Sequence, residues 1–245
     1  MFLFKKDQSR DNIRQINQKD ATPFQVVGLT FNLLYQRLNI WIYINFLFIL
    51  SSVGIMSAPA GKYALYHTIM ATFKDPGNSR TNHFSEMKNS FKSHFWSALL
   101  LAFVKWSSLG LIVWSLLFWL NQESILFKLL SVISIYGLIE WGLITPYIMP
   151  ILLEHPEISV FDAYKMAFML TSKNPVQALF FFIVNLFLLI LGMILLGPVL
   201  LFLPTLRAML FVHSYWYLSG EEIPGFIEID KYVNTHYANQ ENEDI

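Results

Sequence analysis

Four apolar runs, each long enough to cross a lipid bilayer, decide which folds are open to this chain. Each run contains at most one charged residue, and the runs, with that residue, are 38–61 (none), 93–122 (Lys105), 129–153 (Glu140) and 174–220 (Arg207). A helix needs about 20 apolar residues to span the hydrocarbon core. Every backbone group in that core must be hydrogen-bonded within the protein. The runs therefore predict an all-α, polytopic membrane helix bundle.

The composition agrees with this class and argues against several functions. Of 245 residues, 55% are hydrophobic and 14% are charged, whereas soluble domains carry about 25% charged residues. The net charge is zero, which gives no support for nucleic-acid binding. The chain has no cysteine, so disulfides and thiolate chemistry are excluded. Its histidines lack metal-binding spacing and no catalytic motif is present, so we expect no enzyme, metal or cofactor.

The pattern predicts about six transmembrane helices, at roughly 38–56, 57–73, 95–120, 126–153, 176–196 and 198–218. Gly192, Gly197 and Pro198 provide the break between the last two. Amphipathic segments at 81–94 and 159–170 are expected to lie on the membrane surface. The second span is short and carries Lys62 and His67, so five spans are the alternative.

Lysine and arginine residues indicate the orientation. Six precede residue 38, four lie in 74–94 and two in 154–174, whereas the opposite side offers only Lys62 and Lys128. The positive-inside rule then places both termini and both amphipathic helices in the cytoplasm. This divides the chain into a cytoplasmic arm (1–24), a transmembrane helical domain (25–218) and an acidic cytoplasmic tail (219–245).

A weak internal repeat accompanies the amphipathic segments. The pattern Phe84-x3-Lys88-x2-Phe91 is echoed by Phe161-x3-Lys165-x2-Phe168, and each copy is followed by an Ala-Leu pair that opens a span. Repeats of this kind recur in transporters. Any surface helix that precedes a span can also look like this, so duplication and coincidence both remain open.

The charges inside the apolar runs are the main candidate site. Counted from the cytoplasmic ends of their spans, Lys105, Glu140 and Arg207 lie at similar depth, and Asn45 and Asn185 fall at a comparable level. Burying a charge in hydrocarbon costs about 3 kcal/mol on insertion scales. One interpretation is a midplane site for an anionic or polyhydroxylated solute, and the other is a structural ion pair in which Glu140 neutralises Lys105.

Lysines of the amphipathic segments form a second candidate set, namely Lys88, Lys92 and Lys165. Basic surface helices contact anionic lipid or a partner subunit. The alternative is that these lysines only reflect the positive-inside rule.

Several short motifs resemble the YesL-like bacterial integral membrane family, the domain of unknown function 624. They are Asn32-Leu33-Leu34 with Asn39 and Trp41, then Ala58-Pro59-Ala60-Gly61, Ala64-Leu65-Tyr66, and the segment from Phe84 to His94. The resemblance covers roughly residues 25–215. It implies a multi-pass protein of the bacterial cytoplasmic membrane, often encoded near genes for carbohydrate uptake and breakdown, and it brings no catalytic residues.

Two functions follow as expectations. The resemblance suggests an accessory protein for carbohydrate uptake or utilisation that acts through protein contacts, for example with a sugar transporter permease. The intramembrane charges suggest a carrier or channel for a small polar solute. The sequence leaves the oligomeric state undetermined.

Overall fold

A computed structural model describes residues 21–74, 82–194, 202–221 and 223 of the chain. These residues form helices and no strand, which confirms the predicted all-α class for the described part. The helices are α2 (Pro23–Gln36), α3 (Leu38–Ser51), α4 (Ala58–Lys74), α5 (His83–Ser93), α6 (Phe95–Leu120), α7 (Ile125–Glu154), α8 (Val160–Lys173), α9 (Pro175–Ile194) and α10 (Leu203–Ser219).

Polar side chains mark the starts of the amphipathic helices. Thr22 begins α2 with a capping box, in which Gln25 Oε1 accepts a hydrogen bond from the Thr22 backbone N–H across 2.6 Å. Asn82 caps α5 and Ser159 caps α8, each accepting from the backbone N–H three residues further on. Such caps satisfy N–H groups that a helix start leaves without a partner. Because of these caps, α5 and α8 begin close to the first residues of the predicted amphipathic segments.

Within the described residues, three helices, α6, α7 and α9, are long and apolar enough to cross a bilayer. A fourth span results if α2 and α3, which meet at a 90° bend, are counted as one broken crossing. The predicted third, fourth and fifth spans correspond to these three helices. The number six is not confirmed, because α4 and α10 have only 17 residues each and rise about 25 Å, less than the roughly 30 Å core.

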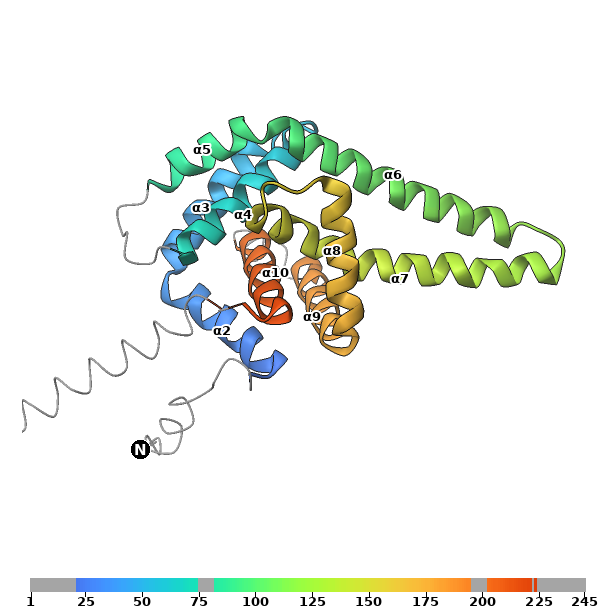
Figure 1. The fold of residues 1–245 in the computed structure, drawn as a ribbon. Helices are drawn as coiled ribbons and strands as arrows, with labels where there is room; N and C mark the ends of the chain where they lie inside the picture. The colour runs from blue at the N-terminus through green and yellow to red at the C-terminus, as the bar shows by residue number, and fades with distance from the viewer. Residues whose placement is uncertain (1–20, 75–81, 195–201, 222, 224–245) are drawn as a thin grey trace, which may run out of the picture.

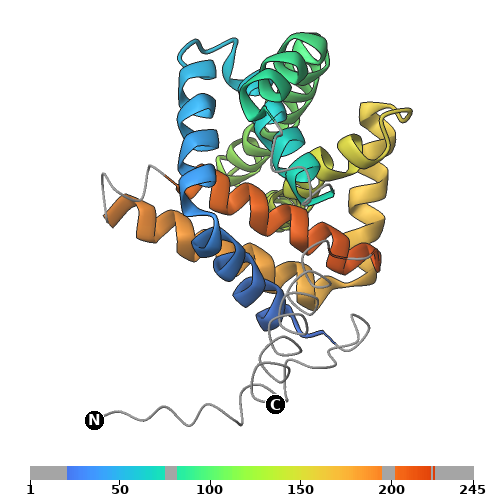
Figure 2. The same ribbon diagram turned by 90° about the vertical axis from the view of Figure 1, so that its left-hand side faces the viewer.

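Helices α4 and α10 form the centre of the molecule. Most of their side chains are buried, including Leu65, Ile69, Met209 and Trp216. Helix α4 contacts α3, α5, α6 and α7 as well as α10. Figure 2 shows α9 and α10 side by side, with α2 crossing them at one end. Helices α4 and α10 are thus the most enclosed helices of the described part, which explains why their sequences tolerate more polar residues.

Helices α6 and α7 form an antiparallel hairpin whose outer part projects beyond the other helices (Figure 1). The hydroxyls of Ser115 and Ser134 lie 3.0 Å apart, and Trp141 Nε1 donates to Ser108 Oγ across 3.1 Å. The remaining surface is apolar and exposed, as at Trp114 and Ile133. Large exposed apolar surfaces are characteristic of membrane or protein contacts, and the predicted bilayer provides such surroundings.

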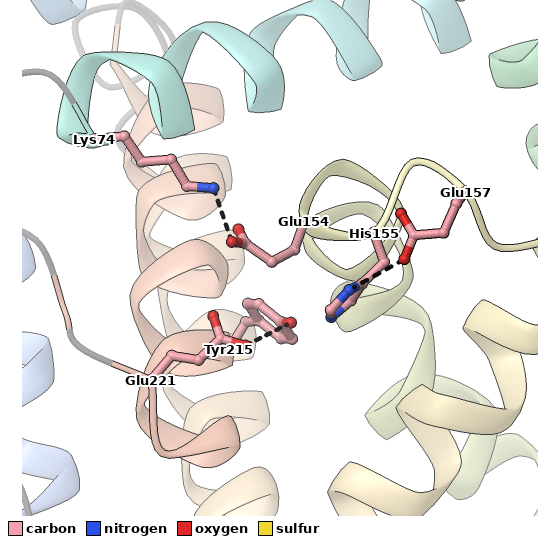
Figure 3. A network of polar contacts seen from close by, with 6 residues as sticks. All are labelled: Lys74, Glu154, His155, Glu157, Tyr215 and Glu221. Carbon is pink, nitrogen blue, oxygen red and sulfur yellow. Dashed lines mark hydrogen bonds and ion pairs between the residues drawn. The ribbon is translucent and has the colours of Figure 1, made fainter.

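The ends of α4, α7 and α10 meet in one polar cluster (Figure 3). Lys74 Nζ lies 2.8 Å from Glu154 Oε1, and Tyr215 donates to Glu221 Oε1 across 3.3 Å. Burial, followed by the nearby Glu154 carboxylate, raises the pKa of Glu221. The sequence predicts that the chain emerges into the cytoplasm at the ends of all three helices, and the structure brings these ends together.

Some predictions lie wholly or partly outside the described residues. Of the arm, residues 1–20 are not described, and of the acidic tail only 219–221 and 223 are. Gly197 and Pro198 of the predicted break also fall outside them, whereas Gly192 lies within α9 and does not interrupt it. Within the described part, α5 leads directly into α6 and α8 into α9. This is the order that the repeat predicts, but the repeat itself stays a prediction.

Candidate functional site

A cavity of about 410 Å³ lies among α3, α4, α6, α7, α9 and α10. Three cationic side chains line it: Lys62 from α4, Lys105 from α6 and Arg207 from α10. No carboxylate is among its lining residues in the described part of the chain. The size falls within the range of about 300–1,000 Å³ that is usual for small-molecule sites.

Each cation is positioned by a neighbour that leaves its charge uncompensated. The Nζ of Lys62 lies 5.8 Å from the centre of the Tyr66 ring, and the Nζ of Lys105 lies 5.4 Å from that of Trp141. Arg207 Nε donates a hydrogen bond to Asn185 Oδ1 across 2.7 Å. Aromatic faces and amide oxygens orient a cation without neutralising it. None of the three forms an ion pair with a carboxylate of the described residues.

The three charges also act on one another. Because all three side chains line the same cavity, Lys105 and Arg207 repel Lys62. Like charges held together in surroundings of low polarity raise the energy of the empty site. They also create a strong positive potential that attracts anions.

Neutral polar groups complete the wall of the cavity. Thr145 donates its hydroxyl hydrogen to the Trp141 carbonyl oxygen across 2.6 Å, so its oxygen can still accept a hydrogen bond. The next residue, Pro146, has no N–H and cannot bond to the carbonyl one turn earlier in α7. Tyr66 and Asn185 also line the cavity. Donors and acceptors for a hydroxyl-bearing ligand therefore accompany the three cations.

The predicted polar cluster is only partly assembled. Lys105, Arg207 and Asn185 line one cavity, as the common depth suggested. Asn45 is buried beside it, where its Oδ1 accepts from Thr205 Oγ1 across 3.2 Å, and it ties α3 to α10.

Glu140 does not join the cluster. Its carboxylate accepts a hydrogen bond from Tyr136 on the same helix across 2.7 Å, and it does not line the cavity. The ion pair between Glu140 and Lys105 is therefore not formed. Successive residues of a helix point about 100° apart, and because Trp141 faces Lys105, its neighbour Glu140 points elsewhere.

The charge pattern of the sequence predicts that Lys62 lies on the side opposite the cytoplasm, away from the other two cations. The structure places it in the cavity, one helical turn from Tyr66. The signal was present in the sequence, since a charge and an aromatic residue four positions apart share a helix face. Because Lys62 was expected on the outer side of the membrane, it was not included in the predicted cluster.

A second, apolar cavity of about 640 Å³ adjoins the first. The two share Phe48, Lys62, Lys105 and Thr145 in their walls. The other side chains around the second cavity are almost all apolar. The two lysines therefore stand where a charged cavity meets an apolar one.

The predicted lipid-contact lysines, Lys88, Lys92 and Lys165, are all exposed. Lys88 lies over the Phe84 ring, 5.9 Å from its centre, beside an apolar hollow of about 280 Å³ between α3 and α5. These positions leave the three ammonium groups free to meet an anionic surface. Among the described residues, no group of three or more carboxylate and imidazole side chains could hold a metal ion.

Comparisons with family models, with curated proteins and with solved structures give no match to the chain. The resemblance to the YesL-like family therefore stays a prediction that rests on the motifs quoted above.

Proposed function

We propose that this chain is a multi-pass membrane protein that binds a small, hydroxyl-bearing anion in the cation-lined cavity and carries it across the bilayer. The observation that supports this most directly is the convergence of Lys62, Lys105 and Arg207 on one cavity without a lining carboxylate. A sugar phosphate represents this class of solute.

The charge arrangement favours an anion site over a structural ion pair. An intramembrane cation costs about 3 kcal/mol on insertion scales, and such residues mark solute pathways by default. A structural pair needs a carboxylate partner, but Glu140 bonds to Tyr136 instead. A bound anion offsets the mutual repulsion of the cations.

The neutral groups of the wall favour a solute with hydroxyl groups. Thr145 and Tyr66 carry hydroxyls, and Asn185 holds Arg207 through its Oδ1 while its amide N–H groups remain for other bonds. Arginine binds phosphate and carboxylate groups through paired hydrogen bonds. This combination supports a phosphate or carboxylate head on a polar body.

We place the protein in a bacterial cytoplasmic membrane with both termini in the cytoplasm. The apolar surface of the α6–α7 hairpin supports insertion, and the cluster at the ends of α4, α7 and α10 supports a common side for these ends. The exposed lysines, Lys88, Lys92 and Lys165, would then face anionic headgroups of the inner leaflet.

Flux into liposomes tests the proposal. We expect the purified full chain to carry radiolabelled glucose 6-phosphate, but not glucose, into vesicles of zwitterionic lipid. Lys105→Gln should lower the flux at least tenfold, because it removes one cation from the cavity. Lys92→Gln removes the same charge from an exposed position on α5 and should leave the flux unchanged. Equal flux of both sugars, or equal loss in both variants, would contradict an anion carrier.

A second candidate function is supported by the outer part of the α6–α7 hairpin. The outer part of the hairpin stands clear of the other helices (Figure 1), and its aromatic side chains Trp114 and Phe118 are exposed. Aromatic residues are enriched in the cores of protein–protein interfaces. An accessory role in carbohydrate uptake would use this surface against a sugar transporter permease.

Co-purification with a co-expressed sugar transporter permease tests the accessory role. Trp114→Ala with Phe118→Ala should abolish the association if the hairpin is the contact, whereas Lys105→Gln should leave it intact. Association that survives the hairpin substitutions, or no association at all, would count against this second candidate.

A further inference from the structure

We infer that the preferred ligand is an amphiphilic anion, whose charged head occupies the cation-lined cavity and whose alkyl chain occupies the adjoining apolar cavity. This inference rests on the proposed anion site and specifies the chemical class of its ligand. It arises from the continuity of the two cavities at Lys62 and Lys105.

The position of the lysines fixes the direction of such a ligand. We call the cation-lined cavity the inner cavity and the adjoining apolar cavity the outer cavity. Lys62 and Lys105 line both cavities, whereas Arg207 and Asn185 line only the inner one. An oxyanion held by all three cations therefore lies in the inner cavity. Anything attached to it on the side of the lysines extends into the outer cavity.

The outer cavity suits a hydrocarbon chain. Its wall includes Phe48, Leu101, Ile148 and Met149, and apart from the two lysines no titratable side chain lines it in the described part of the chain. A small polar solute would gain nothing from these apolar walls. An alkyl chain would gain van der Waals contacts with all of them.

The mouth of the outer cavity lies at the surface of the protein. Val53 and Ile55, in the turn between α3 and α4, and Trp106 on α6 line the cavity and are exposed, Ile55 by 96%. These apolar groups favour a mouth that opens into hydrocarbon rather than into water. An amphiphile can then enter sideways from the bilayer with its chain still in an apolar medium.

The test uses the full chain in nanodiscs of zwitterionic lipid and compares inorganic phosphate with octyl phosphate. Both compete against radiolabelled phosphate, and octyltrimethylammonium serves as a cation of equal chain length. We expect octyl phosphate to displace the label at least about tenfold more effectively than inorganic phosphate, and the cation to displace none.

Ala102→Phe isolates the apolar cavity. Ala102 lines the outer cavity but not the inner one, so a phenyl ring there should remove the advantage of octyl phosphate while the affinity for inorganic phosphate stays the same. Octyl phosphate partitions into the lipid of the nanodisc to the same extent with either protein, so this partition does not affect the comparison between the wild type and the variant. If Ala102→Phe does not fold, Ile55→Asn, at an exposed turn position, should reduce the same advantage.

A direct measurement covers the case in which bare phosphate binds too weakly to compete. A brominated octyl phosphate should quench the fluorescence of Trp106 in a saturable way, read as the difference between the wild type and Trp106→Phe. Lys105→Gln should remove the saturable part, and Lys92→Gln should not.

The outcomes separate this inference from the proposed function. If phosphate binds through Lys105 but octyl phosphate binds no better, the amphiphile is excluded and the anion site stands. If neither ligand binds in a manner that depends on Lys105, the anion site fails and the amphiphile fails with it. When octyl phosphate is preferred, competition by phosphatidic acid in the nanodisc identifies the bilayer as the source, and lack of competition identifies a water-soluble amphiphile.

Discussion

Arg207 on α10 donates a hydrogen bond from its Nε to Oδ1 of Asn185 on α9 across 2.7 Å, and both residues line the same cavity. These residues are 22 positions apart in the sequence. The bond ties together two neighbouring helices and aims the guanidinium group. It therefore links the stability of the bundle to the geometry of the anion site.

Two substitutions of Asn185 separate these effects. Asn185→Leu leaves Arg207 Nε unpaired and should lower stability by about 1–3 kcal/mol, or several degrees of melting temperature, while weakening anion binding. Asn185→Asp gives Arg207 a carboxylate, so it should preserve or raise the melting temperature while weakening anion binding further. Thermal unfolding and phosphate binding of both variants provide the check. Undiminished binding in Asn185→Asp would contradict the electrostatic argument.

The hydropathy pattern was sufficient to predict the long apolar helices. Helices α6 and α7 match the predicted third and fourth spans to within a residue or two, because an uninterrupted apolar run with polar turns at both ends leaves little choice. Asn121 to Ser124 form the short polar turn between these two helices. Helices α4 and α10 were harder to predict from hydropathy, because a helix that is enclosed by other helices is not required to be apolar on every side.

The cavity was only partly predictable. The position of a charged residue along a span determines its depth in the membrane, but not the neighbouring helix toward which its side chain points. Common depth grouped Lys105 with Arg207 and Asn185, and all three line the same cavity. The same argument included Glu140, which faces elsewhere, and omitted Lys62, which belongs to the site. Rotation about a helix axis depends on packing between helices, which a single sequence does not specify.

Close packing at Gly61 offers a test of the turn that shapes the outer cavity. A Cβ there would come within 2.8 Å of Ser51 Oγ, which donates to the Phe48 carbonyl oxygen. Gly61→Ala should therefore cost about 1 kcal/mol through the displaced hydrogen bond. Gly110→Ala is the matched control: nothing lies within 4 Å of its Cβ, so improved helix propensity should leave stability equal or higher. Equal melting of both variants would contradict the close contact.

The stability of the polar cluster in Figure 3 should depend on pH through Glu221. Because burial and Glu154 raise the pKa of Glu221 above its ordinary value of 4.5, the folded chain holds this proton more tightly than the unfolded chain does. The contribution of protonated Glu221 to the free energy of unfolding is full below pH 4.5, and it is lost as the pH rises through the raised pKa. The melting temperature of the wild type, relative to that of Glu221→Gln, should therefore fall between pH 4.5 and 7. A constant difference would show that Glu221 is not perturbed.

The absence of cysteine from the natural sequence makes the topology directly measurable. Single substitutions Gln122→Cys, in the α6–α7 turn, and Glu157→Cys, beyond α7, should react with an impermeant maleimide from opposite sides of the membrane. Lys165→Cys should share the side of Glu157→Cys. Labelling of all three from one side would show that α7 does not cross the bilayer.

Direct binding of phosphate to the purified full chain tests the anion site most directly, with Lys62→Gln as the decisive variant. Lys62 is one of the two cations that line both cavities, and its loss should raise the dissociation constant at least tenfold, because a charge-assisted hydrogen bond contributes about 1.5–3 kcal/mol. Lys92→Gln should leave the constant unchanged. If phosphate binds wild type, Lys62→Gln and Lys92→Gln equally well, the cation-lined cavity is not the anion site.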